Sequence, residues 1–245
     1  MTIEEQTRTV ILWDLPVRLV HWAFVGLMPA LWWTARNGKL DLHEKIGMTM
    51  LGLVVFRLLW GVVGSSTARF ASFVRGPAAV MAYLRGMRSS DSVPIVGHNP
   101  LGGLSVIALL GLLGAQVTLG LFAQDTDGIF SGPLNHLVSW DTASTMSAAH
   151  GLVFNLILLF VVVHIAAIAF YRIAKRDNLV GPMVSGRKRF AESIVAPRIA
   201  PLWRALVIAA IASTIAVWLA WGAPPWGSPF PWDKPADVVD EQSYM

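Results

Sequence analysis

Residues 149–165 read AHGLVFNLILLFVVVHI, and this stretch decides the fold of the chain. It is a long apolar run that begins and ends beside histidines, His150 and His164, which stand 14 residues apart. An α-helix rises about 1.5 Å and turns about 100° per residue, so the two side chains lie about 21 Å apart and within about 40° of one face. One helix can therefore present two imidazole ligands at two levels along its axis.

The composition of the rest of the chain indicates a membrane protein. Of 245 residues, 55% are hydrophobic and 14% are charged, and the mean hydropathy is +0.57. A soluble core cannot bury so much apolar surface. We therefore expect an all-α integral membrane protein. The segments with the length and apolarity of spanning helices are residues 16–35, 42–64, 99–122, 146–173 and 202–221.

The first segment is predicted to be a retained helix and not a secretory signal, because Glu4 and Glu5 precede it and no small-residue cleavage site follows it. Cysteine is absent from the chain. This excludes disulfides, thiolate-ligated or covalently attached haem, and iron–sulfur clusters held by this chain. Histidine must then hold any redox centre.

The distribution of basic residues predicts the orientation of the helices, because Arg and Lys accumulate in cytoplasmic loops. The loop between the third and fourth segments instead contains Asp125, Asp127 and Asp141 and no Lys or Arg, so we expect it outside. The amino terminus is then inside and the carboxyl terminus outside. The net charge of +4 reflects this topology and not affinity for nucleic acid. The basic loops contain Arg69, Arg75, Arg85 and Arg88 after the second segment, and Lys175, Arg176, Arg187, Lys188, Arg189 and Arg198 after the fourth.

This topology decides which histidines share a level of the membrane. His21 and His164 fall near the inside, and His43 and His150 near the outside. Each pair can hold one b haem through its imidazole nitrogens, which predicts two haem b groups and electron transfer. The alternative is that the histidines only hydrogen-bond neighbouring helices. Two depth-matched pairs favour ligation, because ionisable groups in hydrocarbon are costly and tend to mark function.

Two arginines are candidates for contacts with the cofactor. Arg57 lies 14 residues after His43, near the level of the inner pair. A buried Arg needs an anion, and a haem propionate is a suitable one. Arg18, one turn before His21, is a second candidate, although it could also extend to lipid headgroups.

The start of the third segment offers candidates for a quinone pocket, because quinone chemistry needs a hydrogen-bonding or titratable group. His98 and Asn99 lie there. His98 could also contact a propionate, and a helix-capping role explains Asn99 equally well. His136 has no partner at its depth and is expected to be a solvated loop residue.

Several motifs in order resemble the bacterial cytochrome b561 family, which includes the b-type cytochrome subunits of membrane-bound nickel–iron hydrogenases. The resemblance covers residues 13–188. It implies a four-helix, dihaem b core in the bacterial inner membrane, with ligands at His21, His43, His150 and His164, which passes electrons between the quinone pool and a redox partner. The motifs are WDLPVRLVHW (13–22), LHEKIG (42–47), FRLLWGVVGS followed by ARF (56–70), GHNPLGG (97–103), AHG and VHI around His150 and His164, and NLVGPMVSGRK (178–188).

The chain extends beyond this four-helix core. We expect residues 1–190 to form the cytochrome domain and residues 191–245 to add a fifth spanning helix and a periplasmic tail. The tail contains GAPPWGSPFPW (222–232), which cannot form a regular helix because of its prolines. Its aromatic residues suit an interfacial anchor, or else a docking surface for a periplasmic partner.

The expected function is electron transfer across the membrane between quinone and a periplasmic partner such as a c-type cytochrome, for which the acidic outer loop suits a basic docking face. No side chain is assigned a catalytic role. A related alternative is the membrane anchor and electron-transfer subunit of a hydrogenase or other dehydrogenase. Another is a stand-alone superoxide:quinone oxidoreductase, with Arg36 and Lys39 as outer cations. A haem-free structural or assembly subunit is the non-redox alternative.

Overall fold

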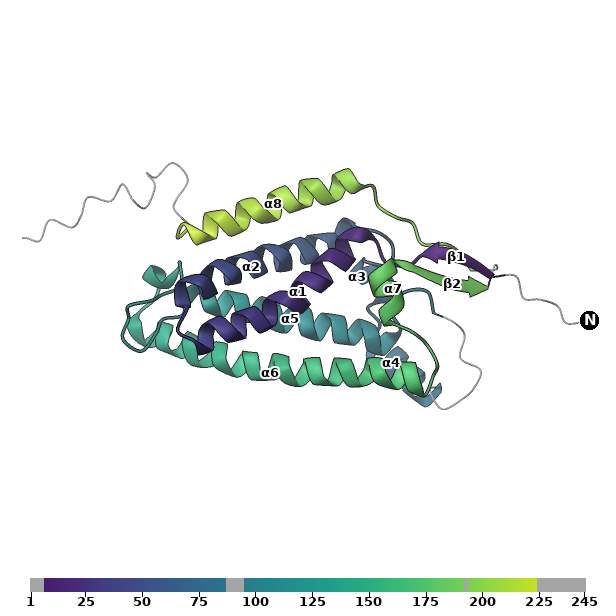
Figure 1. The fold of residues 1–245 in the computed structure, drawn as a ribbon, viewed down its shortest axis with the longest axis horizontal. Helices are drawn as coiled ribbons and strands as arrows, with labels where there is room; N and C mark the ends of the chain where they lie inside the picture. The colour runs from purple at the N-terminus through teal and green to yellow at the C-terminus, as the bar shows by residue number, and fades with distance from the viewer. Residues whose placement is uncertain (1–6, 87–94, 192–193, 224–245) are drawn as a thin grey trace, which may run out of the picture.

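The structure is a computed structural model that describes residues 7–86, 95–191 and 194–223. Within these residues five long helices run side by side (Figure 1) and are long and apolar enough to cross a membrane. This confirms the predicted all-α membrane class and the five predicted spans. The residues of the tail beyond Ala223, and Glu4, Glu5 and Arg88, lie outside the described part of the chain. The long helices are α1 (Leu15–Arg36), α2 (Leu40–Val63), α5 (Pro100–Phe122), α6 (Trp140–Ile173) and α8 (Leu202–Ala220).

Local capping residues decide where two of these helices begin. The Asp14 side chain accepts a hydrogen bond from the Val17 backbone N–H at 2.8 Å, at the start of α1. Asn99 accepts one from Gly102 N–H at 2.8 Å, at the start of α5. A proline occupies the first turn of both helices. Proline is favourable there because its missing N–H would have no intrahelical partner.

Helix α6 begins at Trp140, six residues before the predicted position, so that boundary was wrong. Ser139 caps the helix by accepting from the Thr142 backbone N–H at 3.3 Å. Asp141 lies in the first turn, where a negative charge complements the helix dipole. This polar first turn lowers the local hydropathy, which is why hydropathy alone placed the start too late.

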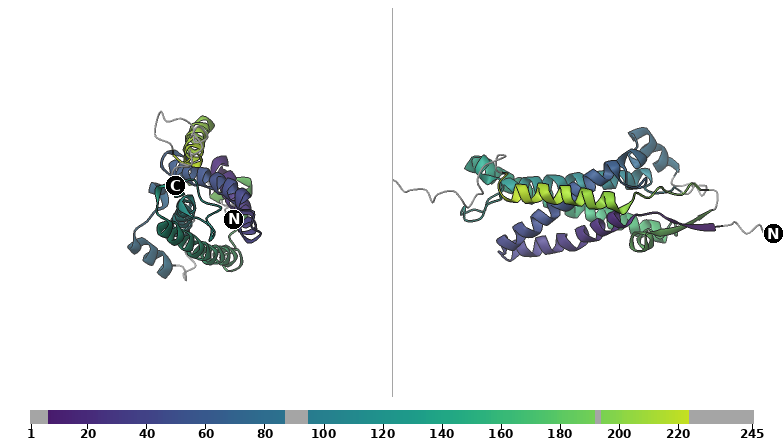
Figure 2. Two further views of the ribbon diagram at one scale, coloured as in Figure 1. Left: turned by 90° about the vertical axis from the view of Figure 1, so that its left-hand side faces the viewer. Right: turned by 90° about the horizontal axis from the view of Figure 1, so that it is seen from above.

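The helices pack around α2, which contacts α1, α5 and α8, while α5 pairs with α6. Helix α8 lies along the outer side of α2 (Figures 1 and 2). Gly52 of α2 faces Ala216 of α8, and a Cβ on the glycine would lie 3.5 Å from the Ala216 Cβ, an ordinary van der Waals distance. Helix α1 packs on α2 and not closely on α6, and both α1 and α6 leave most of their apolar side chains exposed, as lipid-facing helices do.

A two-stranded sheet pairs the segment before α1 with the segment after α7 (Val180–Ser185), and this sheet was not predicted. Strand β1 (Thr7–Ile11) pairs antiparallel with β2 (Arg187–Ala191). The short helices α3 (Phe70–Phe73), α4 (Pro77–Gly86) and α7 lie at this same end of the bundle (Figure 1). The 3-10 helix η1 (Asn135–Leu137) lies at the opposite end.

The two ends differ in charge, and we name them accordingly. The basic end holds the starts of α1, α5 and α8 and the ends of α2 and α6 (Figure 1), whereas the acidic end holds the opposite termini of these helices. The basic end carries Arg69, Arg75, Lys175, Arg176, Arg187, Lys188, Arg189 and Arg198, and the acidic end carries Asp41, Glu44, Asp125, Asp127 and Asp141.

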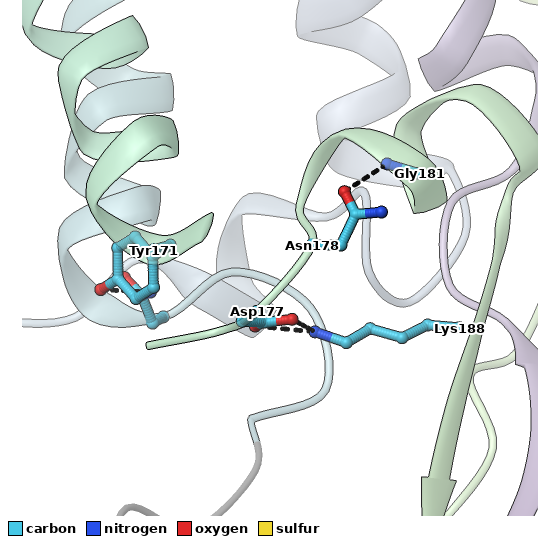
Figure 3. Close-up of polar contacts among 6 residues, drawn as sticks. Tyr171, Asp177, Asn178, Gly181 and Lys188 are labelled. Atoms are coloured by element: carbon cyan, nitrogen blue, oxygen red, sulfur yellow. Dashed lines mark hydrogen bonds and ion pairs between the residues drawn. The ribbon is translucent and has the colours of Figure 1, made fainter. Parts of the chain in front are cut away.

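The segment after α6 folds back toward α1 through polar contacts (Figure 3). Lys188 of β2 donates to both carboxylate oxygens of Asp177, at 2.7 and 2.9 Å. Asn178 accepts from the Gly181 backbone N–H at 3.0 Å and so begins the turn into α7. The Asp177 backbone N–H donates to the carbonyl of Tyr171 at 3.0 Å. These bonds give the polar residues around the run NLVGPMVSGRK a structural role that does not involve the cofactor sites.

Gly186 completes this return of the chain. Its backbone has φ +80°, which L side chains rarely adopt, and a Cβ there would lie 2.7 Å from Nη1 of Arg18. Its carbonyl accepts hydrogen bonds from the backbone N–H groups of Leu12 (2.8 Å) and Trp13 (3.2 Å). The glycine therefore lets the segment after α7 approach the start of α1.

Candidate cofactor sites

Helix α6 places His150 and His164 at two levels, and an apolar cluster separates them. Ile157 lies midway between the two histidines in sequence and is 0% exposed. It packs with Val54 of α2 and with Leu110 and Leu113 of α5. The bundle is therefore closed by aliphatic side chains between the levels, which leaves two distinct sites, an outer site toward the acidic end and an inner site toward the basic end.

At the outer site, helices α2 and α6 bring His43 and His150 together. Their ring centres are 6.2 Å apart and the rings are inclined at 73°. Two imidazole nitrogens that each lie about 2 Å from one shared metal ion leave ring centres roughly 6 Å apart. The separation between these rings would therefore allow both histidines to hold one metal ion.

Hydrogen bonds orient both rings of the outer pair. Nδ1 of His43 lies 3.0 Å from the carbonyl of Leu31 and 3.2 Å from Oγ1 of Thr34, and Nδ1 of His150 lies 3.0 Å from the carbonyl of Gln116. A carbonyl only accepts, so each Nδ1 must donate its hydrogen, and Nε2 of the neutral ring keeps a free lone pair. Histidine ligands of metals are oriented in this way. The sequence analysis did not identify Thr34 or Gln116 as residues of this site.

Space also adjoins the outer pair. A Cβ on Gly47, one turn after His43, would meet no atom within 4 Å. Gly120 of α5, in contrast, lies close to the His150 ring: a Cβ added at Gly120 would lie 3.2 Å from Cε1 of His150. A flat ligand beside the rings thus has room along α2, while α5 supports the His150 ring.

At the inner site, His21 of α1 and His164 of α6 are less constrained. Nδ1 of His164 lies 3.4 Å from Oγ of Ser105, another residue that sequence reasoning missed. Nδ1 of His21 is buried and has no hydrogen-bond partner. In the part of the chain that the structure describes, no ring contact joins His21 to His164, in contrast to the outer pair. The inner histidines thus share a level without touching.

Arg57 is a buried cation of α2 toward the basic end. The residue is 7% exposed, and its guanidinium lies 5.3 Å from the centre of the Phe70 ring. Its Nη1 is buried and has no hydrogen-bond partner in the described residues. A guanidinium stays charged in proteins, and the buried carboxylate of Asp14 compensates part of the Arg57 charge.

His98 packs between two aromatic rings at the same end. Its ring centre lies 4.5 Å from that of Trp13 and 4.6 Å from that of Phe73, and its Nδ1 is buried without a partner. Burial, together with the neighbouring Arg57 and His164, lowers the pKa of His98 to about 3. His98 is therefore a neutral ring near the inner site.

The structure gives Arg18 and Asn99 contacts with the protein itself. The Arg18 guanidinium donates to the carbonyl of Val184 in α7, although its Nε remains buried and unpartnered. Asn99, besides capping α5, donates from Nδ2 to the hydroxyl of Tyr171 at 2.9 Å. That hydroxyl lies 2.8 Å from the hydroxyl of Tyr83. His136 is exposed, as expected, with Nδ1 at 3.1 Å from the carbonyl of Pro133.

The unpartnered buried polar atoms test whether the sites fit haem. Buried polar groups are normally hydrogen-bonded, so an unpartnered one needs an explanation. All five such side-chain atoms among the described residues belong to or adjoin the histidine levels, and four of the five residues were singled out from the sequence. The guanidinium N–H donors of Arg18 and Arg57 would suit the propionates of haem b, whereas the amide oxygen of Gln116 is an acceptor that a propionate would not satisfy. The atoms are Arg18 Nε, His21 Nδ1, Arg57 Nη1, His98 Nδ1 and Gln116 Oε1.

Asp14 is a residue of the inner level that the sequence analysis did not assign. Its carboxylate is buried, and Oδ2 accepts from Nε1 of Trp60 at 2.9 Å while Oδ1 caps α1. Trp60 is fully buried and stacks on Phe56, with ring centres 5.9 Å apart. Asp14 thus fixes α1, which carries His21, against α2, which carries Arg57. An Asp directly before Leu-Pro is a helix-start signal that could have identified it.

Comparisons with known proteins identify the family of the chain. The model of the family described as prokaryotic cytochrome b561 matches residues 12–186. A curated relative, a probable Ni/Fe-hydrogenase B-type cytochrome subunit of Bradyrhizobium diazoefficiens, is 23% identical over 216 residues, which cover 75% of this chain and 87% of the relative. No solved structure gives a significant match. The family match spans α1 to α7 and ends before α8.

Proposed function

The chain belongs to the prokaryotic cytochrome b561 family, and from this premise we propose that it carries electrons across the membrane between the quinone pool and a periplasmic redox partner through two b haems. Family membership makes it a b-type cytochrome, a multi-pass bacterial membrane protein of electron transport that binds haem b. The number of haems, their ligands, the quinone and the partner are parts of the proposal.

The proposed axial ligands are His43 with His150 at the outer site and His21 with His164 at the inner site. The observation that carries this assignment is the outer geometry: ring centres 6.2 Å apart, with both Nδ1 atoms tied to backbone carbonyls. Haem b supplies a one-electron iron centre. Because histidines take both axial positions, the site favours electron transfer over oxygen binding.

Arg57 compensates negative charge at the inner site. Its unpartnered Nη1 is suited to a carboxylate, such as a propionate, because a charge-assisted hydrogen bond in a buried site stabilises both groups. Arg18 is the weaker assignment, since its guanidinium already donates to Val184. The aromatic contact with Phe70 holds the Arg57 guanidinium in position.

The proposed quinone pocket lies at the start of α5, beside His98 and Asn99. Asn99, Tyr171 and Tyr83 form a hydrogen-bonded chain there, which can donate to or accept from a quinone oxygen. Burial and the hydrogen bond from Tyr171 raise the pKa of Tyr83, so its hydroxyl keeps its proton. This supports a hydrogen-bond donor, and not an anionic base, at that position.

We further propose that the basic end faces the cytoplasm, in line with the accumulation of Arg and Lys there. Residues 1–190 then form the cytochrome domain, and residues 191–245 add α8 and the tail. The packing of α8 on α2 through small residues supports its role as a fixed addition to the core. The acidic end would present its carboxylates to the periplasmic partner.

The first experiment is an anaerobic absorption spectrum of the purified protein, with haem quantified per chain, before and after addition of a soluble quinol analogue. We expect about two b haems per chain that become reduced by the quinol. A preparation without haem would overturn the redox proposal and favour a structural subunit. One haem per chain would overturn the dihaem assignment.

A second candidate function is the membrane anchor of a hydrogenase or other dehydrogenase that feeds electrons to quinone. The observation that favours it is the similarity to the Bradyrhizobium protein, a probable Ni/Fe-hydrogenase B-type cytochrome subunit. In that case both haems stay oxidised with the quinol analogue and become reduced with dithionite. Complete reduction by quinol would instead favour the direction toward a periplasmic acceptor.

A further inference from the structure

A pocket of about 570 Å³ opens at the basic end, in the size range of small-ligand sites. It lies between the segment that follows α2, the start of α5 and the segment before α8. His98 contributes to its wall. We name it the basic pocket because three arginines, Arg69, Arg75 and Arg198, line it and no acidic residue does so among the described residues.

The three arginines have no carboxylate partner in the described part of the chain. The ion pairs there are Lys45–Asp41 and Lys188–Asp177, both away from the pocket. Arg75 donates to the carbonyl of Ser72 at 2.9 Å, which leaves most of its donors available. The three arginines are exposed, so water and salt screen part of the repulsion between their guanidinium groups, and an anion between them would reduce it further.

The chain holds these arginines in place from two distant segments. The Ser66 N–H donates to the Arg198 carbonyl at 2.9 Å, and the Arg198 N–H donates to Oγ of Ser66 at 3.0 Å. The Ala200 N–H donates to Oγ of Ser65 at 2.9 Å. The accumulation of Arg and Lys in cytoplasmic loops explains arginines at this end of the bundle. It does not explain the hydrogen bonds that hold Arg198 beside the segment of Arg69.

The level of the pocket and its apolar rim indicate the membrane interface. Val195 lines the pocket and is 87% exposed, and Ile95 is also exposed. Helix α4 starts two residues after Arg75, buries no residue and exposes Met81. An amphipathic segment beside a basic cluster is typical of contact with anionic lipid headgroups.

We propose that the basic pocket binds a phosphate group through the guanidinium groups of Arg69, Arg75 and Arg198, with the phosphate supplied by an anionic phospholipid or by free phosphate from the cytoplasm. Arginine forks match the oxygens of phosphate in geometry and charge. Basic pockets between membrane helices on the cytoplasmic side are suited to such headgroups. This site adjoins the proposed quinone pocket, because His98 also lines it, but none of its three arginines is part of the haem or quinone assignments.

The test uses the full-length holoprotein, delipidated in detergent and titrated separately with phosphatidylglycerol, phosphatidylcholine and inorganic phosphate. Native mass spectrometry counts bound lipid, and tryptophan fluorescence follows the melting temperature. The variant is R69Q/R198Q, and R187Q/R189Q is the matched control, with the same change in charge at the same end but outside the pocket. Haem per chain is measured in every sample, so that loss of a haem site is distinguished from loss of this site.

We expect phosphatidylglycerol to bind the wild type and the control one to one, and to bind R69Q/R198Q roughly 25-fold more weakly, about fivefold for each arginine. Inorganic phosphate that binds and stabilises in the same variant-dependent way, without lipid binding, would identify free phosphate as the source. If R69Q/R198Q does not assemble, R75Q serves, with an expected loss of about fivefold. Equal binding by variant and control overturns the proposal. So does a result in which neither phosphatidylglycerol nor inorganic phosphate binds.

Discussion

The outer and inner histidine pairs differ in how completely the protein itself organises them. At the outer site, the rings of His43 and His150 face each other, and each Nδ1 is held by a backbone carbonyl. At the inner site, Nδ1 of His21 and Nη1 of Arg57 are buried without hydrogen-bond partners among the described residues, and no ring contact there joins His21 to His164. The outer site is therefore preorganised, whereas the inner site needs a ligand to satisfy its polar groups.

This difference has an energetic meaning. A buried hydrogen-bond donor or acceptor without a partner costs about 1–3 kcal/mol, and more if it is charged. The inner level holds Arg18, His21, Arg57 and His98 in this condition, while the outer level has Gln116. Cofactor binding should therefore contribute more to the stability of the inner half of the bundle than to that of the outer half. The predictions below test this asymmetry.

The largest effect is expected from removing one ligand of each pair in turn. His150→Ala should lose the outer haem and His164→Ala the inner haem, so that haem per chain falls by about half in each, because a single remaining histidine holds haem weakly. We expect a larger fall in melting temperature for His164→Ala. Haem quantification and thermal melting in detergent measure both effects.

His136→Ala is the matched control for these variants, since His136 is exposed and its ring bonds only to the Pro133 carbonyl among the described residues. Its haem content should equal that of the wild type. If His150→Ala loses as much stability as His164→Ala, the proposed asymmetry between the two sites is wrong. Retention of both haems in both variants would contradict the ligand assignment.

Asp14→Ala should destabilise the inner half without removing a ligand. It removes the cap of α1, worth about 0.5–2 kcal/mol, and leaves Nε1 of buried Trp60 unpaired, worth about 1–3 kcal/mol. We expect a total loss of about 2–4 kcal/mol and faster loss of the inner haem. Chemical denaturation followed by tryptophan fluorescence, and haem release to an acceptor protein, measure these effects.

Ser139→Ala separates the contribution of a helix cap from that of the hydrogen bond between Asp14 and Trp60. It removes only an exposed cap, that of α6 at the acidic end, and should cost about 1 kcal/mol. A loss in Asp14→Ala no greater than that in Ser139→Ala would show that the Asp14–Trp60 contact contributes little. The inner site would then not depend on this link between α1 and α2.

Arg57→Met should change the redox behaviour of one site only. A buried cation favours the reduced, more negative state of a nearby centre, so its removal should lower the reduction potential of the inner haem. The shift is on the order of 60 mV for each tenfold change in the equilibrium constant between the oxidised and reduced states. Spectroelectrochemical titration resolves the two centres, and the outer one serves as an internal reference. Arg57→Lys keeps the charge and should restore most of the potential. Equal shifts of both centres would place Arg57 between the sites.

The sequence predicted the features that depend on local pattern. Hydropathy found all five spans, and the spacing of His150 and His164 together with the alternating direction of the helices identified the levels at which the histidines lie. The structure adds what local pattern cannot contain. The acceptors for His43 and His150 are the backbone carbonyls of Leu31 and Gln116. Every residue has a backbone carbonyl, so the residue type does not indicate which one accepts the bond.

The pairing of β1 with β2 was missed for a related reason. The two strands are separated by about 175 residues, and each is only five residues long. Their sequences, TRTVI and RKRFA, carry too many charges to read as buried strands. The strands form because the turn at Gly186 and the start of α1 meet at the basic end, which only the packed bundle determines.

The smallest effect is expected from the ion pair that closes this end. Lys188→Ala removes the bond to Asp177, whose side chain is 37% exposed, so solvent screens the pair and the cost should be below about 1 kcal/mol. Lys45→Ala, which breaks the more exposed pair with Asp41 at the acidic end, is the control, with an expected cost of about 0.3–0.5 kcal/mol. Both losses should shrink in 1 M salt, as denaturation midpoints at two salt concentrations would show. A loss for Lys188→Ala of several kcal/mol that salt does not reduce would mean that the return of the chain after α6 depends on this contact, and that the basic end is held as rigidly as the outer histidine pair.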